Sequence, residues 1–162
     1  MRTPVEIICW ILLCVFYSWQ GKYLSIYGVS PDWLFVTVVA SAAFSSRVRG
    51  STWAFVIGLY ADILGGGAVG ANALIYTLSA WIVQIVAQRF DFFDRLTQVV
   101  VLFLFSWPVY LAGWLLAALF SHDAWFSVKQ FCAVPFLNAI AAPFVFFVML
   151  EIKSFFRFYE KN

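Results

Sequence analysis

The feature that most constrains this chain is a series of long apolar runs that contain no charged residue. They cover residues 7–21, 33–46, 50–61, 71–88, 96–121 and 130–150. A helix of about 20 residues crosses the roughly 30 Å hydrocarbon core of a bilayer. Of all residues, 64% are hydrophobic and 11% are charged, whereas a soluble domain is about 25% charged. The sequence therefore predicts an all-α polytopic membrane bundle with about six transmembrane helices, in which residues 1–162 form a single integral membrane domain.

The second and third runs are short, and their topology has two solutions. They either cross the membrane fully or form a hairpin that dips into it and needs protein around its backbone. Basic residues favour the cytoplasmic side of a membrane, and with both termini inside they divide eight to two. The cytoplasmic segments then hold Arg2, Arg47, Arg49, Arg89, Arg95, Lys153, Arg157 and Lys161, and the outer loops hold Lys22 and Lys129. Full crossing fits this division best, although a hairpin gives almost the same one.

Ionisable side chains inside the predicted spans are too few for catalysis. Asp62 lies within the third helix, and Glu6 lies at the very start of the first. One carboxylate cannot act as both acid and base, and a metal site needs three or four ligands. We therefore expect no enzyme, no catalytic residue, no metal site and no cofactor. The basic residues are scattered and form no patch, so we also expect no nucleic-acid partner.

Asp62 needs a partner, because a carboxylate within a span costs roughly 2.5 kcal/mol or more at the helix centre. Gly58 lies one turn before it on the same face, where a small residue lets another helix approach closely. The glycines within residues 65–70 permit a tight turn with exposed backbone amides, and Asn72 can donate to the carboxylate. Two interpretations stay open: Asp62 caps the amides of residues 66–72, or it bonds to a partner protein or a substrate.

Small and polar side chains recur at helical spacing in the later runs, which is typical of helices that pack closely in lipid. Tight packing inside the bundle is the default interpretation. The alternative is a pocket lined by Asp62, Thr77, Gln84 and Asn138. The many Phe and Trp residues are expected mostly to face lipid or the interfaces. The loop at residues 89–95 should lie at the headgroup level with its three Phe rings in the interface.

Two stretches carry a resemblance to a known family. The first is "GLYADILGGGAVGANAL" at residues 58–74, and the second is "SPDWLFV" at residues 30–36. Together with the size, the short spans, the basic loop after the second run and the charged tail, they resemble the rod-shape-determining membrane protein MreD family. The resemblance rests on Gly58, Leu59, Asp62, Gly65, Gly70, Ala73 and Leu74 in the first stretch. The candidate partner-binding or structural residues are Gly58, Asp62, Gly65, Gly70, Asn72, Pro31 and Asp32.

This resemblance implies a non-enzymatic scaffold of the cell-wall elongation machinery, the elongasome, in the bacterial inner membrane, where it is required for rod shape and peptidoglycan synthesis. The implied partner is the bitopic protein MreC, with the actin-like MreB, peptidoglycan synthases and membrane lipid nearby; a homodimer or a heteromer stays open. The family's bundle is also similar to the substrate-binding subunit of energy-coupling-factor vitamin transporters. A subunit that binds a vitamin-like small molecule for a membrane transporter is therefore the alternative function.

Overall fold

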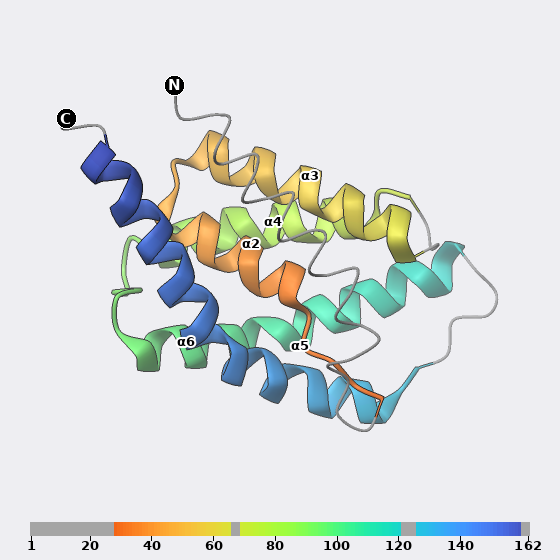
Figure 1. Ribbon diagram of the computed structural model, residues 1–162. Coiled ribbons are helices and arrows are strands. Elements are labelled where there is room, and N and C mark those ends of the chain that lie inside the picture. The colour runs from red at the N-terminus through yellow and green to blue at the C-terminus, as the bar shows by residue number, and fades with distance from the viewer. Residues whose placement is uncertain (1–27, 66–68, 121–125, 160–162) are drawn as a thin grey trace.

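The computed structural model describes residues 28–65, 69–120 and 126–159. Within these residues the chain folds into five α-helices (Figure 1), which confirms the all-α prediction for this part of the chain. They are α2 (Trp33–Phe44), α3 (Arg47–Gly65), α4 (Ala71–Val86), α5 (Arg95–Phe120) and α6 (Val128–Tyr159). The run at residues 7–21, which we predicted as the first span, lies outside the described residues.

The five helices coincide with the last five apolar runs, and the largest differences are extensions. α3 begins at Arg47 rather than at residue 50, and α6 continues to Tyr159 rather than ending at residue 150. Charged residues end an apolar run, but Arg, Lys and Glu are good helix formers and do not end a helix. The apolar runs therefore locate the helices and underestimate the length of two of them.

Two of the described helices, α5 and α6, are long and apolar enough to cross a membrane. α5 has 26 residues, and the apolar part of α6, Val128–Ile152, has 25. α2 has 12 residues and α4 has 16, which correspond to about 18 Å and about 24 Å at 1.5 Å per residue. α2 is thus much shorter than the roughly 30 Å hydrocarbon core of a bilayer.

α2 lies in the middle of the bundle (Figure 1), where it packs against α3, α4 and α6. Every residue from 34 to 42 is buried. Its two buried hydroxyl groups, on Thr37 and Ser41, donate to carbonyl oxygens of α2 itself. A helix that is enclosed on all sides is apolar all round, and protein rather than lipid covers its backbone. Such enclosure is what a helix too short to cross a bilayer would need if it lay within the membrane.

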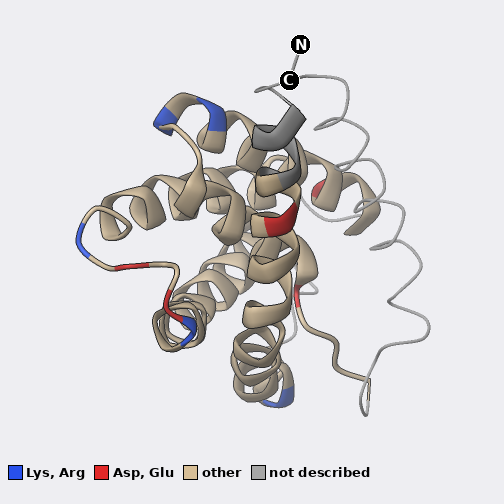
Figure 2. Cartoon of the chain, turned by 60° about the vertical axis from the view of Figure 1, so that its left-hand side comes forward, with Lys and Arg blue, Asp and Glu red and all other residues tan. Residues whose placement is uncertain are grey.

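Successive helices run in opposite directions, so their connections fall at two ends of the bundle (Figure 1). The α2–α3 and α4–α5 turns lie at the same end, and Arg47, Arg49, Arg89 and Arg95 lie on or beside these two turns (Figure 2). Lys129, in the first turn of α6, lies at the opposite end. We call the first end the basic end.

Aromatic rings of α5 contact rings of α6 and of Phe126, just before α6. The contacts run from Phe103 and Phe136, whose ring centroids are 5.0 Å apart, to Trp114 and Phe126, 5.2 Å apart. Rings of Trp107, Tyr110 and Phe131 lie between these pairs. Edge-to-face aromatic pairs contribute about 0.5–1.5 kcal/mol beyond their buried area, so this chain of rings helps to hold the α5–α6 pair together.

The loop at residues 89–95 differs from its prediction in one ring. Phe90 and Phe93 are exposed, as expected for rings in the interface, but Phe92 is only 3% exposed and stacks on Phe146 of α6. The carbonyl oxygen of Phe92 also accepts a hydrogen bond from the Gln98 side chain (2.8 Å). The prediction is therefore wrong for Phe92, because a stacking partner on α6 and a donor on α5 hold it inside the bundle.

Candidate functional site at the helix junctions

Asp62, in the last turn of α3, is buried and caps the start of α4. Its carboxylate accepts hydrogen bonds from the backbone N–H groups of Gly70 (2.9 Å), Asn72 (2.9 Å) and Ala73 (3.2 Å). The first N–H groups of a helix lack partners within the helix, and the helix dipole favours a negative charge beside them. These are contacts of the kind that the capping interpretation predicts, with the donors at residues 70–73. Asn72 contributes its main chain to this site.

Of Gly58, Gly65 and Gly70 around this cap, two are required, for different reasons. At Gly58, an added Cβ atom would lie 2.6 Å from both the nitrogen of Ala73 and the carbonyl oxygen of Asn72, so a side chain would force α3 and α4 apart. Gly70, immediately before α4, has a φ of +99°, a conformation that other residues adopt only with strain. An added Cβ at Gly65 would meet nothing within 4 Å. Helix packing therefore requires Gly58, and the turn requires Gly70.

Asp32, immediately before α2, is a second carboxylate with several partners. Its Oδ1 atom accepts a hydrogen bond from the N–H of Phe35 (3.0 Å) and so caps α2. Its Oδ2 atom accepts one from the hydroxyl of Tyr76 on α4 (2.8 Å), and its own N–H donates to Oδ1 of Asn138 on α6 (2.7 Å). Pro31, which precedes it, is buried. One residue at the start of α2 thus bonds to two other helices.

Asn138 extends this network to α5. Its Nδ2 donates to the hydroxyl of Ser106 (2.9 Å), and that hydroxyl donates to the carbonyl oxygen of Leu102 in the preceding turn (2.7 Å). Asn138 and Ser106 are almost completely buried. Polar networks at this depth are stabilising when every member has a partner. We call this chain of hydrogen bonds, from Tyr76 through Asp32 and Asn138 to Ser106, the Asp32 network.

Asp62 and Asp32 each lie in one of the two sequence stretches that resemble the MreD family, and comparison with known proteins tests that resemblance for the chain as a whole. A family model described as rod shape-determining protein MreD matches residues 3–155. The chain belongs to the MreD family. Comparisons with curated proteins and with solved structures give no match. Membership of the MreD family supports a role in determining rod shape and, together with the apolar α5 and α6, a location in a membrane.

In this MreD-family chain, the first two turns of α4 donate hydrogen bonds to both carboxylates, Asp62 and Asp32. Ala73 donates its N–H to Asp62 of α3, and Tyr76, three residues later, donates its hydroxyl to Asp32 before α2. Tyr76 was not among the residues predicted to take part in a site. A buried tyrosine hydroxyl usually has a hydrogen-bond partner, so a polar contact could have been inferred, but its partner is 44 residues away in the chain.

The four side chains considered as a pocket lining are not brought together. Asp62 caps α4, whereas Asn138 belongs to the Asp32 network. The Thr77 hydroxyl donates to a carbonyl oxygen of its own helix (2.6 Å). The Gln84 side chain lies near the opposite end of α4, where its Nε2 is 3.4 Å from the carbonyl oxygen of Arg47. Interhelical packing and helix caps account for these polar residues, as the default interpretation predicts.

The carboxylates of Asp62 and Asp32 act in this structure as hydrogen-bond acceptors. Among the described residues, no group of three or more His, Cys, Asp or Glu side chains could hold a metal ion. Asp62 and Asp32 accept hydrogen bonds that begin α4 and α2. In this bundle, these hydrogen bonds hold α2 and α3 in a set arrangement relative to α4.

Proposed function

We propose that this chain is a non-enzymatic scaffold of the elongasome in the bacterial inner membrane, with both termini in the cytoplasm, and that it acts by binding a bitopic MreC-like protein. The match of the MreD family model over residues 3–155 carries this proposal. The buried carboxylate of Asp62 and the partly buried one of Asp32 serve as helix caps, which supports a structural rather than a chemical role. An MreB-like actin homologue and peptidoglycan synthases are the further partners of the same assembly.

The Gly58 face of α3 is occupied by the first turn of α4, so the partner helix meets α3 from outside. Phe55 and Ile63 are exposed on α3, at 50% and 68%, whereas Ile57 is buried at 2%. Photocrosslinking groups at positions 55 and 63 should therefore capture the MreC-like partner, and one at position 57 should not. Equal capture from all three positions, or from none, would contradict binding at this face.

The cellular test is depletion in the native host followed by complementation. Loss of the protein should turn rod-shaped cells into rounded ones and remove the MreC-like partner from purified elongasome complexes. A Gly58→Ala variant should complement poorly, because it disturbs the α3–α4 contact, and Gly65→Ala should complement fully. Unchanged rod shape on depletion would argue strongly against the scaffold.

The transporter-subunit alternative gives a different result in the same preparations. It requires a vitamin-like small molecule retained on the purified protein, with affinity lost on substitution of Asp62 or Asn138. The scaffold requires no such ligand. Mass spectrometry of material extracted from the purified protein distinguishes the two functions, because a stoichiometric small molecule would favour the transporter subunit.

A further inference from the structure

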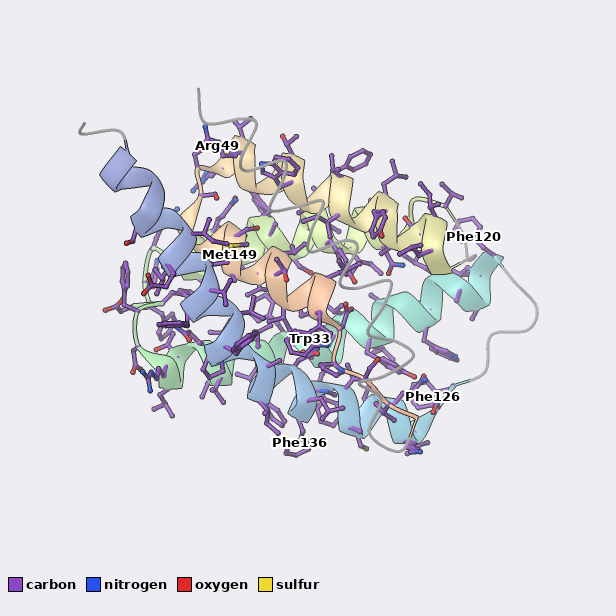
Figure 3. All side chains as sticks on the ribbon, viewed as in Figure 1. Trp33, Arg49, Phe120, Phe126, Phe136 and Met149 are labelled. Carbon is purple, nitrogen blue, oxygen red and sulfur yellow. The ribbon has the colours of Figure 1, made fainter. Side chains whose placement is uncertain are left out.

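A groove of about 510 Å³ lies between α5 and α6, on the outside of the bundle. Its lining residues are all apolar: Val99, Val100, Phe103, Leu104, Phe136, Ala139, Ile140 and Pro143. Phe136 points away from α2 and α3 (Figure 3), and its ring contacts that of Phe103, which lines the groove from α5. The small Ala139 and the in-helix Pro143, in a helix that bends along its length (Figure 1), leave the space open.

The groove is too short for a transmembrane helix. At 1.5 Å per residue, its lining covers about 8 Å of α5 and about 10 Å of α6, whereas a partner helix would contact the bundle over roughly 30 Å. Along α5, it extends from about 6 Å to about 14 Å beyond Arg95. It therefore lies within the half of the bilayer that is next to the basic end, where one acyl chain of a phospholipid lies.

Arg95 stands at the mouth of this groove. It lies one helical turn before Val99, and Cα–Cβ bonds tilt toward the N-terminus of a helix, so its side chain extends toward the headgroup level. The carboxylate beside it, on Asp94, accepts two hydrogen bonds from Thr97 (both 3.2 Å) and caps α5. Among the described residues, no ion pair of Arg95 is present. The guanidinium group is thus available to a phosphate.

We propose that the α5–α6 groove is a specific site for an anionic phospholipid, with an acyl chain against Val99, Ala139 and Pro143 and the phosphate on Arg95. The site combines an apolar groove, long enough to hold part of an acyl chain, with a cation at the depth of the headgroup that has no ion pair among the described residues. Glu151 lies about 12 Å beyond Pro143 along α6, so its negative charge does not lie beside Arg95 at the mouth of the groove. Basic pockets between membrane helices at the cytoplasmic side bind anionic headgroups in this way. The inference rests on the membrane location and is independent of the elongasome proposal.

Native mass spectrometry of the detergent-solubilised protein, titrated with phosphatidylglycerol or phosphatidylcholine, tests the site. Phosphatidylglycerol should bind more tightly, and Arg95→Gln should weaken its binding about fivefold, which corresponds to about 1 kcal/mol for one basic residue near the membrane surface. Arg89→Gln is the matched control, because it removes an equal charge at the basic end, away from the groove. Equal losses in the two variants, or equal affinity for the two lipids, would overturn the headgroup assignment.

A second pair of variants tests the acyl chain. Ile140→Trp should fill the groove and lower the binding of both lipids several-fold; Ile140 is 75% exposed, so the larger ring does not need to enter the core. Leu115→Trp adds the same bulk on an exposed part of α5 outside the groove and should leave lipid binding unchanged. Undiminished binding in Ile140→Trp would show that the lipid does not occupy the groove.

Discussion

Gly58 on α3 and Ala73 on α4 are in backbone contact, close enough that a Cβ atom at residue 58 would lie 2.6 Å from the Ala73 nitrogen. That same nitrogen donates its hydrogen to Asp62, one turn further along α3. The glycine permits the approach of the two helices, and the carboxylate holds them once they have met. This pairing explains why the two residues are four apart, on one face of one helix.

Gly58→Ala should lower the stability of the protein in detergent by about 1–3 kcal/mol, which is typical of an added methyl group in a well-packed core. The added methyl group would clash with the backbone of α4, which cannot rotate away as a flexible side chain can. Thermal unfolding followed by circular dichroism measures the change. Gly65→Ala is the control, because its Cβ would meet nothing within 4 Å, and a similar loss in that variant would refute close packing at Gly58.

Asp62→Ala should destabilise the start of α4, because it leaves the N–H groups of Gly70, Asn72 and Ala73 without their acceptor. An unsatisfied buried donor costs about 1–3 kcal/mol, so the total loss should exceed that of an ordinary surface cap. Asp62→Asn keeps one acceptor oxygen, so its stability should lie between that of the unmodified protein and that of Asp62→Ala. Hydrogen exchange at these three amides should accelerate most in Asp62→Ala.

The matched control for the Asp62 variants is Asp91→Ala. Asp91 is exposed and accepts a hydrogen bond from the N–H of Phe93 within a turn (2.9 Å), so its loss should change stability by about 0.5 kcal/mol or less. If the two alanine variants were equally stable, the Asp62 carboxylate would not be holding α4.

The sequence was sufficient to locate the helices, because each described helix overlaps one apolar run over most of its length. It was insufficient to predict the hydrogen bonds that Asp62 and Asp32 make to other helices. The capping of α4 by Asp62 was one of two open interpretations, since spacing alone does not tell whether the turn after Gly65 folds back onto the carboxylate. Tyr76 and Phe92 were not assigned to the interior, because their partners, Asp32 and Phe146, are distant in the chain and meet them only after the helices pack.

The Asp32 network should show energetic coupling between helices. Ser106→Ala leaves the Nδ2 group of Asn138 without its acceptor, and Asn138→Ala leaves the backbone N–H of Asp32 without one. Each single variant should lose about 1–3 kcal/mol. The double variant should lose less than the sum by about 0.5 kcal/mol or more, because the two residues share a hydrogen bond. Strict additivity in thermal unfolding would contradict the network.

The cap of α5 gives a pH dependence of known sign. Hydrogen bonds from the Thr97 backbone and hydroxyl to Asp94 hold the pKa of this exposed carboxyl below its ordinary value of 3.8. A lowered pKa adds stability that is present above the ordinary value and is lost as the pH falls through the pKa of the folded state. The difference in midpoint temperature between the unmodified protein and Asp94→Asn should therefore be largest near neutral pH. It should shrink below about pH 4, and a difference that grew on acidification would contradict the assignment.

The antiparallel arrangement makes a prediction about sidedness. The α2–α3 and α4–α5 turns lie at the basic end, and the end of α3 lies at the other (Figure 1). In a background without Cys9, Cys14 and Cys132, single cysteines at the exposed positions Ser46 and Gln88 should react with a membrane-impermeant thiol reagent from the same side. The positive-inside rule predicts that this side is the cytoplasm, so both cysteines should react in inverted vesicles and not in intact spheroplasts. A cysteine at the exposed Gly65 should react in the opposite pattern. Labelling of positions 46 and 88 from different sides would contradict the fold, whereas reversal of all three would contradict the orientation alone.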